Sequence, residues 1–154
     1  MAGHQFEVET IWNLTGPSGM EFSRDHLIRF PGRTELHGSA APAFAGNPAN
    51  LNPEELFVAA ISSCQMLTYL YLCFKNRMTV RSYEDHAAGE LLREGPGNFS
   101  MQRVVLKPVI RFEGAESQQT RALAIRLIQE AHESCFIARS VKTKIEIEPN
   151  FQFL

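Results

Sequence analysis

Two cysteines offer the clearest chemistry in this sequence. Cys64 lies within the polar run SSCQ, in the middle of an otherwise apolar stretch. Cys135 continues the apolar face of a helical pattern near the end of that pattern. A thiolate is a strong nucleophile and is readily oxidised. Most buried cysteines, however, act only as small hydrophobic side chains, so neither residue alone establishes a reactive site.

Cys73 illustrates that inert alternative. It follows Cys64 by nine residues, which in a helix places it on the opposite face and about 13.5 Å further along the axis. Two cysteines that far apart on one helix cannot form a disulfide. We therefore expect Cys73 to be a packing residue.

Arg24 is the candidate cation of the site. It lies between Phe22 and His26 on the apolar face of an alternating strand pattern over residues 21–30. A guanidinium that points inward needs a partner, and it would favour the thiolate form of a nearby cysteine. The alternative is an arginine near a sheet edge whose charged end reaches water.

The sequence contains no common metal-binding or phosphate-binding motif. The five histidines have no metal-ligand spacing, and CxxC and HExxH are absent. A glycine-rich phosphate loop and a serine nucleophile elbow are also missing. We expect no metal and no other cofactor.

Residues 52–75 predict the helix around which the fold is arranged. Asn52 is the expected N-cap, Pro53 the first helical residue, and Glu54 a first-turn carboxylate that suits the positive end of the helix dipole. No charged residue occurs from Leu56 to Phe74, which fits either a membrane span or the centre of a globular core. The polar residues in mid-segment favour the buried helix of a soluble protein.

The remaining patterns predict several strands and one more helix, and they favour the α+β class with mostly antiparallel pairing. A turn is expected at residues 15–19, and Pro108 predicts a sheet edge or a bulge. The expected strands cover residues 5–12, 21–30, 34–37, 79–93, 99–112 and 141–147, and the amphipathic helix covers residues 118–132. At 154 residues the chain is most simply a single domain, 1–154.

Composition excludes some partners. The net charge is −2, whereas nucleic-acid and anionic-membrane binding need an excess of basic residues. The N-terminal residues lack the apolar run of a signal peptide, and three widely spaced cysteines do not form a secreted disulfide framework. We therefore expect a cytoplasmic protein with reduced thiols.

Three segments together resemble the OsmC/Ohr family of thiol-dependent peroxidases. They are NPEELFVAAISSC at residues 52–64, SRDH at residues 23–26, and AHESCFIARSV at residues 131–141. The family pattern has a reactive cysteine ten residues after the glutamate of an NPE helix start, and a second cysteine at the end of a later helix. The chain departs from it at Gln65, where relatives more often carry histidine or an aromatic residue, and in the SCFIARS run.

This resemblance implies an OsmC-like fold and an intertwined homodimer with sites at the subunit interface. It implies that Cys64 is the peroxidatic cysteine, Cys135 the resolving cysteine, and Arg24 and Glu54 the pair that organises the thiolate. The expected substrate is an organic hydroperoxide, with hydrogen peroxide a further one, and the expected reductant is an external dithiol. Two alternatives stay open: a redox or stress sensor without turnover, and a module that binds an apolar ligand.

The position of Glu54 raises a geometric problem. Ten helical residues rise about 15 Å, so Glu54 does not reach Cys64 along a straight helix. Either the helix start bends, or the glutamate of the partner chain completes the site. We expect the second arrangement.

Overall fold

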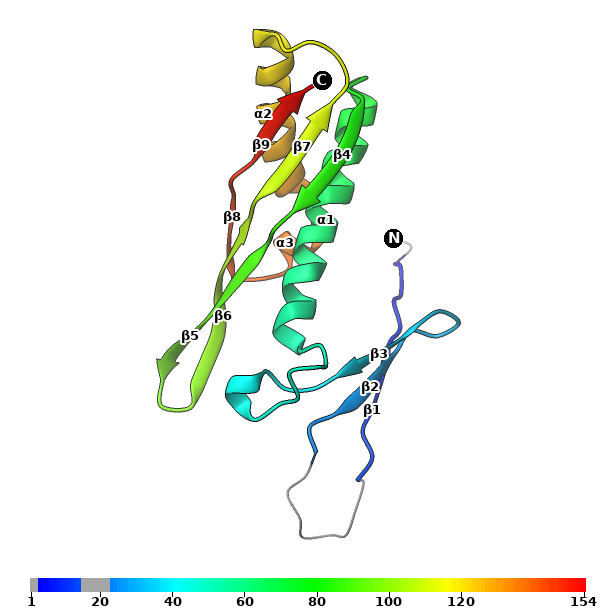
Figure 1. The fold of residues 1–154 in the computed structure, drawn as a ribbon, viewed down its shortest axis with the longest axis vertical. Helices are drawn as coiled ribbons and strands as arrows, with labels where there is room; N and C mark the ends of the chain where they lie inside the picture. Colours follow the sequence, from blue (N-terminus) through cyan, green and yellow to red (C-terminus); the bar gives the residue numbers. More distant parts are fainter. Residues whose placement is uncertain (1–2, 15–22) are drawn as a thin grey trace. The chain divides into compact units, whose positions relative to one another are not determined.

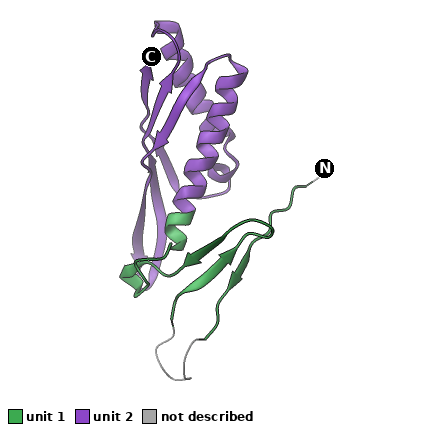
Figure 2. Cartoon of the chain, turned by 45° about the vertical axis from the view of Figure 1, so that its right-hand side comes forward, with its two compact units in different colours: residues 1–56 green, residues 57–154 purple. Residues whose placement is uncertain are grey.

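The computed structural model describes residues 3–14 and 23–154. The chain forms two compact units, Met1–Leu56 and Phe57–Leu154, shown in different colours in Figure 2. The turn expected at residues 15–19 and the strand residue Phe22 lie outside the described residues.

Unit 1 contains a small antiparallel sheet in the order β1-β2-β3. Its elements are β1 (Glu9–Ile11), β2 (His26–Arg29), β3 (Glu35–Gly38) and the short 3₁₀ helix η1 (Pro42–Phe44). The His26 ring lies over Gly38 at the end of β3, where a Cβ would come within 2.4 Å of Nε2. Because β2 is shorter than the predicted strand, Arg24 lies just before it and not within it.

The start of α1 (Pro53–Lys75) confirms the predicted helix signal. The Asn52 side chain accepts a hydrogen bond from the Glu55 amide at 2.9 Å. The Glu55 carboxylate in turn accepts from the Asn52 amide at 3.0 Å. This reciprocal pair satisfies amides that the first helical turn leaves without partners.

Unit 2 contains two three-stranded sheets, β4-β7-β9 and β5-β6-β8. The strands are β4 (Val80–Asp85), β5 (Ala88–Gly95), β6 (Asn98–Leu106), β7 (Pro108–Phe112), β8 (Lys144–Ile147) and β9 (Asn150–Phe153). β4–β7 and β5–β6 pair antiparallel, whereas β6–β8 and β7–β9 pair parallel. The α+β class is confirmed; β9 and the two parallel pairs were not predicted from the sequence.

Three connections join the two sheets of unit 2: β4 to β5, β6 to β7, and β8 to β9 (Figure 1). Asp85 is the last residue of β4, at the first of these connections. Its carboxylate accepts the backbone amide of Lys107, the residue between β6 and β7, at 2.7 Å. Its second oxygen accepts the hydroxyl of Ser62 on α1 at 2.5 Å. Pro108 begins β7, which is the central strand of its sheet, so the predicted sheet edge or bulge is wrong. Proline is also tolerated as the first residue of a strand, because its missing amide hydrogen is not needed there.

Both long helices pack against β7 and β9. α2 (Gln118–Ser134) begins at Ser117, which forms a capping box with Thr120, and the short α3 (Phe136–Arg139) follows it. The larger core cluster joins residues of α1, α2, β7 and β9: Tyr69, Cys73, Ala124, Leu127, Ile128, Ala131, Ile110, Phe112 and Phe151. The α3 turn was not predicted.

Of the helices in the described residues, α1 alone is long and apolar enough to cross a membrane. The core helix of a soluble protein meets the same criteria. One face of α1 is buried by α2 and the sheets, at Ile61, Gln65, Tyr69 and Cys73. Helical spacing of that kind is typical of a helix packed on a protein core.

Replacing Asp85 with alanine should lower the free energy of unfolding by about 2–4 kcal/mol, because two hydrogen bonds to a charged acceptor are lost. Chemical denaturation of Asp85→Ala measures this. Glu84→Ala is the matched control, because the Glu84 carboxylate forms an exposed ion pair with Arg111 at 2.6 Å, worth about 0–1 kcal/mol. Equal losses in the two variants would contradict the structural role of Asp85.

Candidate functional site

The sulfur atoms of Cys64 and Cys135 lie 2.7 Å apart. All three cysteines of the chain are free thiols. Cys64 lies in the middle of α1, and Cys135 immediately follows α2. The structure thus brings together two cysteines that are 71 positions apart in the sequence.

Cys135 occupies the junction of two helices. It is the C-cap of α2 and the N-cap of α3, where its sulfur accepts the amide of Ala138 at 3.4 Å. The residue is fully buried. Burial, and then the hydrogen bond that its thiol donates to the Cys64 sulfur, raise the pKa of Cys135 to about 11. Cys135 is therefore a thiol at neutral pH, placed to donate toward Cys64.

Cys64 lies at the boundary between the buried and the exposed faces of α1, and it is half-buried. Two hydrogen bonds hold this part of α1 in place, one to a strand and one to α2. Ser62 bonds to Asp85 at the junction of the sheets, and Gln65 donates to the carbonyl of Ile128 on α2 at 3.2 Å. A small molecule can thus approach a sulfur whose backbone is held in place.

Cys73 lies in the core cluster with Tyr69. Burial raises the pKa of the Cys73 thiol to about 11, and a hydrogen bond with Tyr69 only partly offsets this. This environment is what the sequence predicted for a packing residue.

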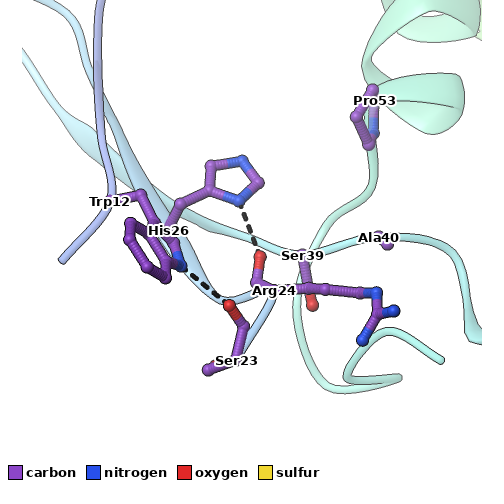
Figure 3. A pocket seen from close by; sticks show the side chains of 7 residues that line it. All are labelled: Trp12, Ser23, Arg24, His26, Ser39, Ala40 and Pro53. Carbon is purple, nitrogen blue, oxygen red and sulfur yellow. Dashed lines mark hydrogen bonds between the residues drawn. The ribbon is translucent and has the colours of Figure 1, made fainter. Parts of the chain in front are cut away.

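Arg24 lines a pocket of about 450 Å³ in unit 1. Figure 3 shows its side chain extending away from Trp12 and the His26 ring. The backbone here is held by two bonds: the Trp12 indole donates to the Ser23 carbonyl at 2.7 Å, and the His26 ring lies 2.9 Å from the Arg24 carbonyl. The pocket is lined by Trp12, Ser23, Arg24, His26, Ser39, Ala40 and Pro53.

Asp25 holds the loop that leads to α1. Its carboxylate accepts the side-chain amide of Asn47 at 3.1 Å. This hydrogen bond, followed by those from Ser39 and Asn50, keeps the pKa of Asp25 below its usual value. The carboxylate therefore fixes the segment between the strands of unit 1 and the helix that carries Cys64.

Glu54 has a buried oxygen without a partner. Its Oε2 atom makes no hydrogen bond to any residue that the structure describes. A buried carboxylate oxygen in this state costs free energy unless another group supplies a donor. Glu54 and Arg24 both belong to unit 1, and the two cysteines of the pair belong to unit 2.

Sequence reasoning did not identify Asp85 and Asp25 as supports of the site. Asp85 ends β4, and two residues separate it from β5; a carboxylate at such a strand break was an available signal. Asp25 lies within the SRDH motif but carried no separate expectation. In the described part of the chain, no group of three or more histidine, cysteine, aspartate or glutamate side chains could hold a metal ion.

In the reduced protein Cys64 should be alkylated faster than Cys73 and Cys135, because it is half-buried while they are buried thiols with raised pKa values. Peptide mapping with iodoacetamide at pH 7 measures the three rates. For Cys73 and Cys135 the rate should rise about tenfold per pH unit up to about pH 11, since each thiol is protonated below its pKa. Faster labelling of Cys73 than of Cys64 would show that the nucleophile is wrongly assigned.

Comparison with known proteins identifies the family. The family model described as "OsmC-like protein" matches residues 46–150. An OsmC-like protein of unknown function from Vibrio cholerae has a similar structure, with 35% identity, a TM-score of 0.85, and coverage of 95% of this chain and 99% of that one. The uncharacterized protein YmaD of Bacillus subtilis is 23% identical over 97 residues, which are 63% of this chain and 64% of that protein's length.

More distant structures share the fold. An organic hydroperoxide resistance protein OsmC from Legionella pneumophila has 14% identity and a TM-score of 0.68, with 99% of each chain covered. An organic hydroperoxide resistance protein from Elizabethkingia anophelis has 18% identity and a TM-score of 0.64, covering 98% of this chain and 99% of that one. The family match over residues 46–150 and the similarity to the Vibrio cholerae structure agree: this chain belongs to the OsmC-like protein family.

Proposed function

We propose that this protein is a thiol-dependent peroxidase that reduces organic hydroperoxides through Cys64 and Cys135. The observation that carries the proposal is the 2.7 Å contact between a half-buried sulfur and a fully buried thiol in one unit. Two relatives of the same fold are named organic hydroperoxide resistance proteins, which supports the same chemistry.

In the first step the Cys64 thiolate attacks the terminal oxygen of the hydroperoxide. The O–O bond breaks, Cys64 becomes a sulfenic acid, and the alkoxide takes up a proton and leaves as an alcohol. The hydrogen bond from the Cys135 thiol supports this step because it stabilises negative charge on the Cys64 sulfur.

In the second step the Cys135 sulfur attacks the sulfenic sulfur of Cys64. A disulfide forms, and the thiol proton leaves with the hydroxyl group as water. An external dithiol then reduces the disulfide by two thiol exchanges and is itself oxidised to a disulfide. Because this cycle needs a supply of reductant, we place the protein in a reducing compartment such as the cytoplasm.

Arg24 and Glu54 are proposed to organise the thiolate. A guanidinium that binds a carboxylate in a fork can hold its charge beside a sulfur, and the buried Oε2 atom of Glu54 has no hydrogen-bond donor among the described residues. Since Glu54 begins the same helix that carries Cys64, we propose that these two residues act on the cysteines of a partner chain.

An apolar stripe on α1 supports a homodimer. Leu67, Tyr71 and Phe74 recur at the spacing of one helical face and are 63%, 59% and 78% exposed. Large apolar side chains grouped on one face mark an interaction surface. We propose that a second copy covers them.

We also propose that units 1 and 2 form one OsmC-like domain, since the family match begins at residue 46 in unit 1 and the Vibrio cholerae structure matches 95% of this chain.

Turnover of cumene hydroperoxide with excess dithiol tests the proposed function. We expect continuous peroxide consumption by the intact chain and by Cys73→Ala, and none by Cys64→Ser. Thiol loss limited to one turnover would instead indicate a redox sensor. Binding of the hydroperoxide without thiol loss would indicate an apolar-ligand module.

Cys135→Ser should spare the first reduction and abolish the next ones, because the sulfenic acid on Cys64 then has no intramolecular partner. Intact mass and peptide mapping after one equivalent of hydroperoxide measure this. The unaltered chain should lose two hydrogens, mapped to a Cys64–Cys135 disulfide. A stable sulfenic acid on Cys64 beside a free Cys135 would make this a one-cysteine enzyme.

Mixed dimers of Cys64→Ser and Glu54→Gln chains test whether the site is shared. If Glu54 acts on the partner's cysteine, each mixed dimer rebuilds one intact site, and up to about half of the activity per dimer returns. Dimers of either variant alone are the controls and should have little activity. Mixed dimers no more active than these controls would place both residues in one chain.

A further inference from the structure

Two side chains of α1 bond to backbone carbonyls of α2. Gln65 donates through Nε2 to the carbonyl of Ile128 at 3.2 Å, and the Tyr69 hydroxyl donates to the carbonyl of Ala124 at 3.4 Å. The later residue of α1 bonds to the earlier residue of α2, so the two helices run antiparallel. The contact between Cys64 and Cys135 lies beyond the C-terminal end of α2, where the chain leaves that helix.

Of these two bonds, the one from Gln65 lies nearer the cysteine pair. Gln65 is adjacent to Cys64, and Ile128 precedes Cys135 by seven residues, or about two helical turns. The relative position of α1 and α2 at this point therefore determines where the two sulfurs meet.

Gln65 is also a costly residue for simple packing. It is 1% exposed, and its Oε1 atom is buried without a hydrogen-bond partner in the described part of the chain. A buried polar atom in this state costs about 1–3 kcal/mol, whereas a methionine would occupy a similar volume without that cost. Core packing alone does not account for an amide here.

We propose that Gln65 is a positioning residue, whose bond to the Ile128 carbonyl fixes the register of α1 on α2 and so holds Cys64 against Cys135. This inference rests on the proposed function, in which the two sulfurs must form a disulfide. The bond excludes other arrangements of the two helices. It therefore raises the effective concentration of the Cys64 sulfur at the Cys135 sulfur.

The Gln65→Met variant tests the proposal, with Tyr69→Phe as its matched control. Each substitution removes one side-chain bond to α2 and keeps a similar volume, but Tyr69 lies one helical turn further from the cysteines. The measurement is the effective concentration of the Cys64–Cys135 pair, from equilibration with oxidised and reduced glutathione. Alkylation and mass analysis quantify the two forms, and circular dichroism verifies folding.

Gln65→Met should lower the effective concentration at least about fivefold, because a small misplacement of reacting atoms weakens intramolecular reactions strongly. Tyr69→Phe should change it by less than about twofold. An unchanged value in Gln65→Met, or equal losses in the two variants, would overturn the positioning role. Failure of the unaltered chain to form the Cys64–Cys135 disulfide would instead contradict the proposed function.

A second measurement uses the unaltered protein. The side-chain amide hydrogens of Gln65 should exchange slowly with solvent in nuclear magnetic resonance spectra of both the reduced and the oxidised forms, because the amide is buried and bonded in each. Exchange as fast as that of an exposed glutamine would overturn the proposal, whatever the behaviour of the variants.

Discussion

The packing of one face of α1 against α2 is the constraint on which the cysteine pair depends. Four side chains spaced one helical turn apart are buried on that face: Ile61, Gln65, Tyr69 and Cys73. Because α2 runs antiparallel to α1, its C-terminal end comes to the middle of α1, and the chain leaves α2 at Cys135 beside Cys64. A shift of one helical turn would move the sulfurs about 5 Å apart along the axis.

The three thiols differ by environment and not by chemistry. Cys73 lies on the buried face of α1, Cys64 at its border, and Cys135 at a junction of two helices. Burial favours the neutral form of a thiol, so it suppresses the reactivity of Cys73 and makes Cys135 a hydrogen-bond donor. Burial thus explains both why Cys73 is a packing residue and why Cys135 can donate a hydrogen bond to Cys64.

The polar residues around Cys64 and Cys135 hold the surrounding elements together by hydrogen bonds. Asp85 joins α1 to the bend between the two sheets, and Gln65 joins α1 to α2. Gln65 places its amide where an apolar side chain would pack well, and Asp85 bonds to two separate elements, so the value of both residues lies in fixing direction and register. In unit 1, Asp25 holds the loop that precedes α1 in the same way.

The sequence by itself determined the helix at residues 52–75, its start at Asn52, the α+β class and the family, because these depend on local periodicity, capping and short motifs. It also separated Cys73 from Cys64, since both lie on one helix of known geometry. Only the tertiary structure decided that the chain breaks between β6 and β7 at Lys107, that β8 pairs parallel with β6 and β9 with β7, and that the sulfurs of Cys64 and Cys135 lie 2.7 Å apart. These features join residues far apart in the chain, and local patterns carry no information about such contacts.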